Sequence, residues 1–461
     1  MNEKNESQGG KLKRELGLTS VVFFIFGYVV GAGILIQTGV TAGETGPALW
    51  LAFIIAGIPQ LINAVITCYI VSAFPVSGGA WVYSSRLTTP FFGFVIVASI
   101  ILHIMGALAM LAIGFGTYFE IFFPGTGYLL AFIVLLAFYV INLLGIKVAG
   151  WVQVVLAICG DFLVIIIFII FGLPNVDPAN LVDPVGGLLP MGIFGIFYGA
   201  IILSFSYAGF QAIIEIGGEI KNPRRNIPLG LIISFFMVAT VYILVSIVMT
   251  GVMNWQTLGS IEGTLVDVGA LFFPPFFLNI LNILILIAIG STIHGVMLAY
   301  SRDLYAAARD HVVPSVLGKV HKRFGTPYWA LTFFVVGACI FLVFQASIID
   351  LSIITNFAMT IPGLVIAYVP IKLKKKYSDL VEKSNFKMNQ KVVVGVTLFN
   401  LGWAIFSIVI MIAYSPNLVI GAAIFYVCAI IYYFIRIKYL DKKGIDIKEI
   451  CKTLPDETLE I

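Results

Sequence analysis

Charged side chains are scarce in this sequence. Of its 461 residues, 11% are charged and 60% are hydrophobic, and the mean hydropathy is +1.05. Soluble domains carry roughly 25% charged residues, so this composition excludes a soluble globular domain. This apolar composition fits a lipid bilayer, and the sequence predicts an integral membrane protein.

Clusters of reactive or metal-binding residues are also missing. The 5 cysteines stand singly, without a C-x-x-C pair, which argues against a disulfide framework and against a metal site. The apolar stretches contain no H-E-x-x-H motif, no paired aspartates and no Ser-His set. The chain also has no G-x-x-x-x-G-K-[ST] phosphate-binding loop. We therefore expect neither an enzyme nor an ATP-driven pump, and no catalytic residue, metal or cofactor.

Apolar stretches long enough to cross a bilayer recur along the chain. A membrane-spanning helix needs about 20 apolar residues. Twelve stretches qualify, at roughly 17–41, 47–72, 91–120, 127–145, 149–173, 191–216, 227–251, 272–300, 328–346, 348–371, 392–414 and 417–438. The first sixteen residues are polar and lack an apolar signal-peptide core, so we expect the first span to act as the insertion signal.

Lysine and arginine are absent from every second loop between these stretches. If the stretches cross the membrane in simple alternation, all 27 basic residues fall on one side, in the two tails and the even-numbered loops. The odd-numbered loops carry only acids, namely Glu44, Glu120, Asp177, Asp183, Glu262, Asp267 and Asp350. By the positive-inside rule, this pattern predicts a multi-pass protein of the cell membrane with cytoplasmic N- and C-termini.

Two spans contain small residues where an uninterrupted helix would be expected. Gly27, Gly31 and Gly33 fall near the middle of the first span, and the run from Ser204 to Phe210 interrupts the sixth. Glycine costs about 1 kcal/mol in a helix interior, and unpaired backbone groups are costly in lipid. Two interrupted spans at matching positions indicate an inverted-repeat transporter whose site lies where both helices unwind. The alternative is that the small residues only allow close helix packing.

Several segments carry specific motifs in a consistent order. They are Gly31-Ala32-Gly33-Ile34, PVSGGAWVY at 75–83, EIKNPRRNIP at 219–228, SRDLYAAARD at 301–310 and KVHKRFGTP at 319–327. Together they resemble the APC (amino acid, polyamine and organocation) transporter superfamily over spans 1 to 10. The resemblance implies an all-α membrane protein with 12 transmembrane helices and a leucine-transporter-like 5+5 inverted repeat, in which helices 1 and 6 are broken.

The resemblance also implies a division of the chain. A cytoplasmic tail at 1–16 precedes a first five-helix repeat at 17–173. An inverted second repeat follows at 191–371, and two peripheral helices lie within 392–438. Residues 439–461 form a second cytoplasmic tail.

By the same similarity, an amino acid binds at the two breaks. Its carboxylate would meet backbone N–H groups around Gly31, Ala32, Gly33 and Ile34, where small side chains let a ligand approach the backbone. Its ammonium would meet carbonyl groups near Val30 and in the second break. The second break comprises Phe205, Ser206, Tyr207, Ala208, Gly209 and Phe210. The aromatic residues of this group are candidates for pocket walls or gates.

Two departures from the family pattern concern ion coupling. Many relatives have an acid where this chain has Gln211, and many proton-coupled relatives have a lysine in span 5 where this chain has Gly160 followed by Asp161. A lone carboxylate at mid-membrane costs at least about 2.5 kcal/mol and points to function. Asp161 is therefore a candidate proton carrier or cation ligand. His294 in span 8 is the second candidate, since spans 5 and 8 are neighbours in this fold.

The sequence thus predicts a secondary active transporter that moves amino acids by alternating access. A neutral substrate, with proton symport or exchange, fits the absence of charge in the breaks. The alternative is a polyamine or cationic amino acid carrier that uses Asp161 and Glu215. A channel would need a continuous polar pore, which the apolar spans do not offer. The expected partners are an amino acid, a coupling proton or sodium ion and membrane lipid, with no nucleic acid.

Overall fold

Helix is the dominant structure of this chain. The computed structural model describes residues 17–73, 79–144, 160, 163–210, 220–261, 264–321, 324–384 and 386–452. Within these ranges the regular elements are helices, and one isolated bridge pairs Asp183 with Gly187. The expected all-α class is therefore confirmed for the part that the structure describes.

The longer helices run through the chain as follows: α1 (Leu18–Val29), α2 (Ala32–Thr45), α3 (Leu49–Ala73), α5 (Pro90–Phe119), α6 (Gly127–Leu143), α8 (Leu163–Gly172), α9 (Gly192–Leu203), α10 (Pro223–Val252), α13 (Pro275–Arg309), α14 (Tyr328–Val343), α15 (Ile348–Lys376), α17 (Gln390–Tyr414) and α18 (Pro416–Lys442). Short helices join them: η1 (Gly46–Ala48), α4 (Gly79–Leu87), η3 (Leu173–Asn175), η4 (Pro178–Leu181), η5 (Ser204–Tyr207), α11 (Trp255–Ser260), α12 (Leu265–Gly269), η8 (Ser315–Gly318), α16 (Ser378–Lys383) and α19 (Ile447–Ile450).

Many of these helices suit a membrane. Seven described helical stretches are long and apolar enough to cross a bilayer, and four shorter apolar helices accompany them. One of the seven runs from Gly33 to Ile70 and covers most of α2 and α3. This finding confirms an integral membrane protein, whereas the count of twelve spans stays a prediction.

Polar residues define where some of these apolar helices begin. The Thr89 side chain accepts a hydrogen bond from the backbone N–H of Phe92 at the start of α5, and Pro90 occupies the first turn. Ser347 and Asp350 form a reciprocal capping box at the start of α15. Such caps pair backbone N–H groups that the first helical turn leaves without partners. They fix the ends of helices whose interiors have little polarity.

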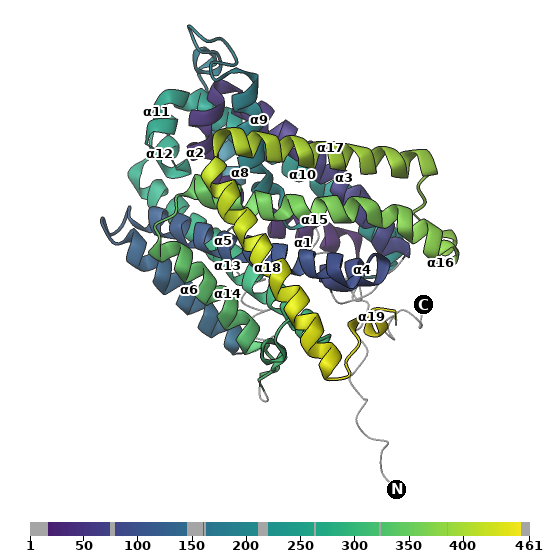
Figure 1. The fold of residues 1–461 in the computed structure, drawn as a ribbon. Helices are drawn as coiled ribbons and strands as arrows, with labels where there is room; N and C mark the ends of the chain where they lie inside the picture. The colour runs from purple at the N-terminus through teal and green to yellow at the C-terminus, as the bar shows by residue number, and fades with distance from the viewer. Residues whose placement is uncertain are drawn as a thin grey trace.

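Helix α5 lies at the centre of the bundle. In its most apolar stretch 89% of the residues are buried, compared with 28% in α17 and 17% in α18. Figure 1 shows α15 and α17 running alongside each other across the front, with α18 crossing the face of the molecule. The central helix therefore contributes to internal cavities, while α17 and α18 present much of their surface to lipid.

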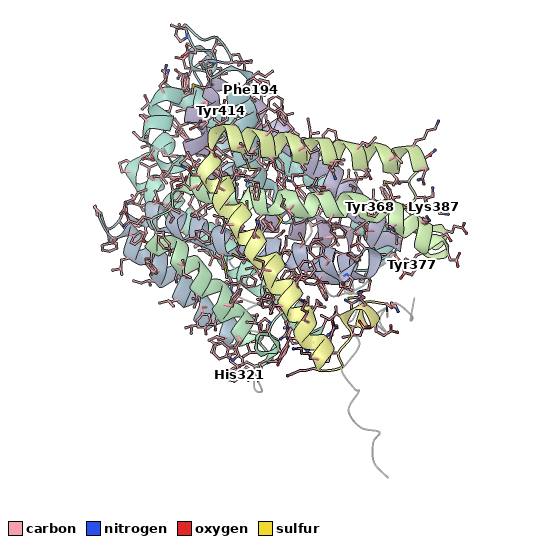
Figure 2. All side chains as sticks on the ribbon, viewed as in Figure 1. Phe194, His321, Tyr368, Tyr377, Lys387 and Tyr414 are labelled. Carbon is pink, nitrogen blue, oxygen red and sulfur yellow. The ribbon has the colours of Figure 1, made fainter. Side chains whose placement is uncertain are left out.

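Labelled side chains mark the two ends of the bundle. Phe194 and Tyr414 lie at one end, and Tyr368, Tyr377 and Lys387 lie at the other (Figure 2). We call these the Phe194 end and the Lys387 end.

An aspartate organises the loop that precedes α9 at the Phe194 end. The carboxylate of Asp183 accepts hydrogen bonds from the backbone N–H groups of Gly186 at 2.7 Å and Val185 at 3.0 Å. These bonds hold the pKa of Asp183 below its usual value. Its second oxygen accepts from the indole of Trp255 at 3.1 Å, which ties the loop to α11. The acid predicted to lie in an odd-numbered loop thus has a structural role there.

Candidate functional site

The first predicted interruption is a true break in the helix. Helix α1 ends at Val29, Val30 is extended with φ −80° and ψ 93°, and α2 begins at Ala32. Gly31 between them has φ −153° and ψ −137° and offers no side chain to cap α2. The first turn of α2 therefore has N–H groups that a ligand can pair, and its dipole favours an anion.

The sixth span is interrupted as well. Helix α9 ends at Leu203 and tightens into the 3₁₀ turn η5, after which Ala208 is extended with φ −66° and ψ 143°. Gly209 follows with φ +118°, a conformation that favours glycine because a Cβ atom would clash. Residues 211–219, including Gln211 and Glu215, lie outside the described residues. The alternative that these small residues serve close packing without unwinding is wrong at both breaks.

The two breaks face each other. A Cβ atom added to Gly33 would lie 2.6 Å from the Cα atom of Ser206, so the backbones of α2 and η5 approach directly. The hydroxyl of Tyr242 donates toward the carbonyl of Val29 at 2.9 Å and that of Ser206 at 2.6 Å. Tyr242 on α10 therefore links both interrupted segments. Tyr242 was not identified from the sequence, although a tyrosine hydroxyl within an apolar helix is a usable signal.

A small cavity of about 40 Å³ lies between the breaks. Helices α5 and α13 complete its walls beside the two interrupted segments. The lining residues are Val29, Gly33, His103, Ile104, Ala107, Phe205, Ser206, Ala208, Gly209, Ser291, Thr292, Gly295, Val296 and Tyr300. The described lining includes no lysine, arginine, aspartate or glutamate, so the cavity suits a group whose charges are met by backbone dipoles.

The predicted site residues do not all line this cavity. Gly33, Phe205, Ser206, Ala208 and Gly209 do. Val30, Gly31, Ala32 and Ile34 shape the first break without being among its described lining residues. Tyr207 points its hydroxyl to the carbonyl of Phe53 at 3.0 Å, and Phe210 packs on Phe235 with ring centres 5.7 Å apart. The last two line a second cavity instead.

A buried amide closes the site toward the Phe194 end. The Gln37 amide nitrogen donates to the carbonyl of Ile202 at 3.0 Å and to the Ser352 hydroxyl at 2.8 Å. Its oxygen accepts from the Ser206 hydroxyl at 2.8 Å. One side chain thus joins α2, α9, η5 and α15. Sequence reasoning missed Gln37 too, although an amide within an apolar span is itself a pointer to function.

The second cavity, of about 210 Å³, extends toward the Lys387 end. It shares walls with the small cavity and reaches Tyr83 and Ser84 on α4, Asp303 on α13 and Val369 on α15. Hydrogen bonds of Gln37 therefore hold the helices together on the side of the Phe194 end, whereas the larger cavity lies on the side of the Lys387 end.

An ion pair lies close to the larger cavity. Arg86 on α4 pairs with Asp310 at 2.8 Å, and the Trp81 indole donates to the same carboxylate at 2.7 Å. Both charged side chains are almost fully buried. The pair therefore fastens α4 to the end of α13.

Comparison with known proteins identifies the family. Residues 16–435 match the model of the amino acid permease family. The chain belongs to this family. The expected superfamily relationship is thereby confirmed, and the permease is an amino acid transporter in the membrane rather than an enzyme.

Individual relatives of the permease support the same assignment. It is 27% identical over 449 residues to the branched-chain amino acid permease BcaP of Bacillus subtilis, covering 90% of this chain and 93% of the relative. It is 26% identical over 466 residues to the amino-acid permease RocE of the same organism, covering 93% and 96%. It is also 27% identical over 409 residues to the methylthioribose transporter of that organism, covering 83% and 86%.

Of the two coupling candidates of the permease, His294 is among the described residues. His294 is fully buried, and its Nδ1 atom lies 2.8 Å from the amide nitrogen of Asn142 on α6. Asp161 lies outside the described residues, as does the predicted contact between it and His294. Gly160 is described, and a Cβ atom there would lie 2.7 Å from the backbone nitrogen of Ala288, so this part of the chain adjoins α13.

His103 on α5 also contacts the site. It lines both cavities, its Nδ1 atom lies 3.2 Å from the carbonyl oxygen of Thr355, and its ring lies 5.8 Å from that of Phe205. Among the described residues, no group of three His, Cys, Asp or Glu side chains is arranged to hold a metal ion.

Proposed function

We propose that the permease carries a neutral amino acid across the cell membrane by alternating access, through proton symport or exchange. The observation that carries this proposal is the pair of helix breaks that face each other across the small cavity. Unwound backbone is tolerated at membrane depth where it lines such a cavity.

The breaks offer complementary charges to a zwitterion. N–H groups at Ala32, Gly33 and Ile34 begin α2, and the positive end of its dipole favours the substrate carboxylate. Carbonyl groups near Val30, Phe205 and Ala208 would receive the ammonium. Phe205, which lines both cavities, would then lie beside the bound main chain.

A neutral side chain agrees with the lining. Asp303 is the one aspartate, glutamate, lysine or arginine among the described lining of both cavities, and it lines the larger one. A charged side chain beside the breaks would lose its hydration without a partner of opposite charge, which is costly. The BcaP relative is named a branched-chain amino acid permease, which supports the same choice.

The twelve-span, 5+5 inverted arrangement with cytoplasmic termini belongs to this proposal. The two breaks lie five spans apart in the predicted order, in spans 1 and 6, which supports an inverted repeat. If the Lys387 end is cytoplasmic, the larger cavity opens inward while Gln37 holds the outer side closed. The structure would then represent an inward-facing state.

Asp161 is the proposed coupling group, with His294 as its partner. Asp161→Asn should preserve counterflow, because exchange needs only the binding site, but should abolish accumulation driven by a proton gradient. Uptake that needs sodium and resists a protonophore at clamped membrane potential would favour a sodium site that includes Ser291 and Thr292, which line the small cavity. Wild-type accumulation by the Asn variant would make Asp161 structural.

Counterflow in proteoliposomes tests the proposed function. Vesicles loaded with one amino acid at a time should accumulate that amino acid in labelled form, with neutral amino acids the most effective. A panel of the twenty amino acids and common polyamines supplies the comparison. Counterflow of polyamines or cationic amino acids alone would overturn the neutral assignment, and absence of counterflow for every amino acid would overturn the proposed function.

A further inference from the structure

The two cavities are adjacent and differ in size. They share His103, Phe205, Ala208, Gly209 and Tyr300 as walls. A volume of about 40 Å³ is close to that of one or two water molecules. The charged main-chain groups of an amino acid would fill it. A side chain of more than a few atoms must therefore extend into the cavity of about 210 Å³.

The larger cavity has walls of two kinds. Ile100, Ile201 and Met359 supply apolar surface from α5, α9 and α15. Helices α3 and α17 supply amide and hydroxyl groups from Gln60, Asn63, Thr67, Asn400 and Ser407, and α15 adds those of Asn356 and Thr360. An apolar wall beside a neutral polar wall fits a side chain with a hydrocarbon stem and an uncharged hydrogen-bonding end.

Ser407 is the residue of the polar wall, formed by α3 and α17, that indicates a ligand most directly. Serines in membrane helices commonly donate back to the carbonyl four residues earlier, as Ser99 does to Val95 at 2.9 Å and Ser352 does to Ile348 at 2.7 Å. Ser407 is 3% exposed and lines the cavity, yet its hydroxyl has no hydrogen-bond partner among the described residues. A buried hydroxyl without a partner is unfavourable unless a ligand or water meets it.

Two amides stand on the same wall. The Asn400 amide nitrogen donates to the Asn63 oxygen at 2.9 Å, which joins α17 to α3. The bond uses neither the amide nitrogen of Asn63 nor the oxygen of Asn400, so the pair keeps both a donor and an acceptor for a ligand. A ligand that needs a donor and an acceptor at once matches this pair.

We propose that the larger cavity binds the side chain of the transported amino acid, and that Ser407, Asn400 and Asn63 recognise an uncharged hydrogen-bonding group at its end. This inference rests on the proposed function and narrows it to long neutral polar substrates, with glutamine as the probe. A cationic end group would find no carboxylate on this wall, because Asp303 belongs to α13. Short amino acids such as alanine do not extend to the polar wall.

Ser407→Ala tests this proposal most directly, because it removes a hydroxyl that makes no hydrogen bond to another described residue. The KM for glutamine counterflow should rise about 3- to 10-fold, the effect of losing one neutral hydrogen bond, while the KM for alanine stays unchanged. Ser99→Ala is the matched control, because Ser99 is buried on α5 outside both cavities. It should leave the ratio of the two KM values unchanged.

A second variant probes the amide pair. Asn400→Leu should shift the preference from glutamine toward leucine, and if it fails to fold, the serine variant still decides. An unchanged glutamine-to-alanine ratio in Ser407→Ala would overturn the inference. So would a wild-type protein that carries leucine and alanine but not glutamine, an outcome that leaves the proposed function intact. A wild-type protein without counterflow of any amino acid would instead refute the proposed function itself.

Discussion

The contact between Gly33 and Ser206 gives the sharpest test of the paired breaks. Gly33→Ala would place a Cβ atom 2.6 Å from the Ser206 Cα atom and 3.0 Å from its hydroxyl oxygen. Carbon atoms normally approach to about 3.5–4.0 Å, so α2 and η5 would have to separate by about 1 Å. The Ser206 atom at the closest approach belongs to the backbone, which cannot rotate away as a flexible side chain would.

The cost of this substitution has two parts. Overpacking of a well-filled site costs about 1–3 kcal/mol. Separating the segments also strains the Ser206–Gln37 bond and the Tyr242–Ser206 bond, and weakening these would add about 1–2 kcal/mol. We therefore expect a loss of about 2–5 kcal/mol in the conformation observed here. The added methyl group would also occupy part of the small cavity, so transport should fall sharply.

Thermal unfolding in detergent and counterflow in proteoliposomes measure the two effects. Gly402→Ala is the matched control, since a Cβ atom at Gly402 on α17 meets nothing within 4 Å. That change should be neutral or stabilise the protein by up to about 1 kcal/mol. Gly33→Val should insert into the membrane but fail to transport. A Gly33→Ala protein that melts and transports like the wild type would refute the close approach of the two breaks.

Three further predictions concern the ends of the bundle. Arg86→Met should destabilise the protein by about 3–5 kcal/mol in thermal unfolding, because it leaves the Asp310 carboxylate buried without its ion-pair partner. The double variant Arg86→Met with Asp310→Leu should recover much of this loss. Because the pKa of Asp183 is lowered, the ionised carboxylate stabilises the loop that precedes α9 above about pH 4, and this stabilisation is lost as the pH falls through the lowered pKa. Protease cleavage of this loop should therefore rise at low pH in the wild type but not in Asp183→Asn. Val185 is 98% exposed, and Val185→Cys should react with an impermeant thiol reagent added outside intact cells, whereas labelling only after permeabilisation would reverse the predicted orientation.

The breaks were predictable from sequence because their signal is local. Three glycines near mid-membrane and the run from Ser204 to Gly209 contradict the rule that lipid-exposed helices stay unbroken. The partners of the breaks were not predictable in the same way. Gln37 and Tyr242 act through hydrogen bonds to chain segments far away in sequence, and nothing in their local sequence names those partners.

The distinction between lining and supporting residues also required the fold. Tyr207 and Phe205 are neighbours within one 3₁₀ turn, yet Tyr207 reaches α3 while Phe205 lines both cavities. The direction of a side chain after a helix break depends on backbone angles that composition does not determine. The polar wall of α3 and α17 was not predicted either, since Asn63 and Ser407 belong to spans that otherwise read as plain apolar helices.

Protection of a single cysteine by substrate would test most directly whether an amino acid binds between the breaks. Ala208 is extended, partly exposed and lines both cavities, so Ala208→Cys should react with a small methanethiosulfonate reagent in a background freed of the native cysteines. A transported amino acid should slow this reaction with a half-maximal concentration that matches its KM, and a cysteine at Val185, which is 98% exposed, should react without such protection. An unchanged reaction rate at saturating substrate, in a variant that still transports, would contradict binding at the breaks.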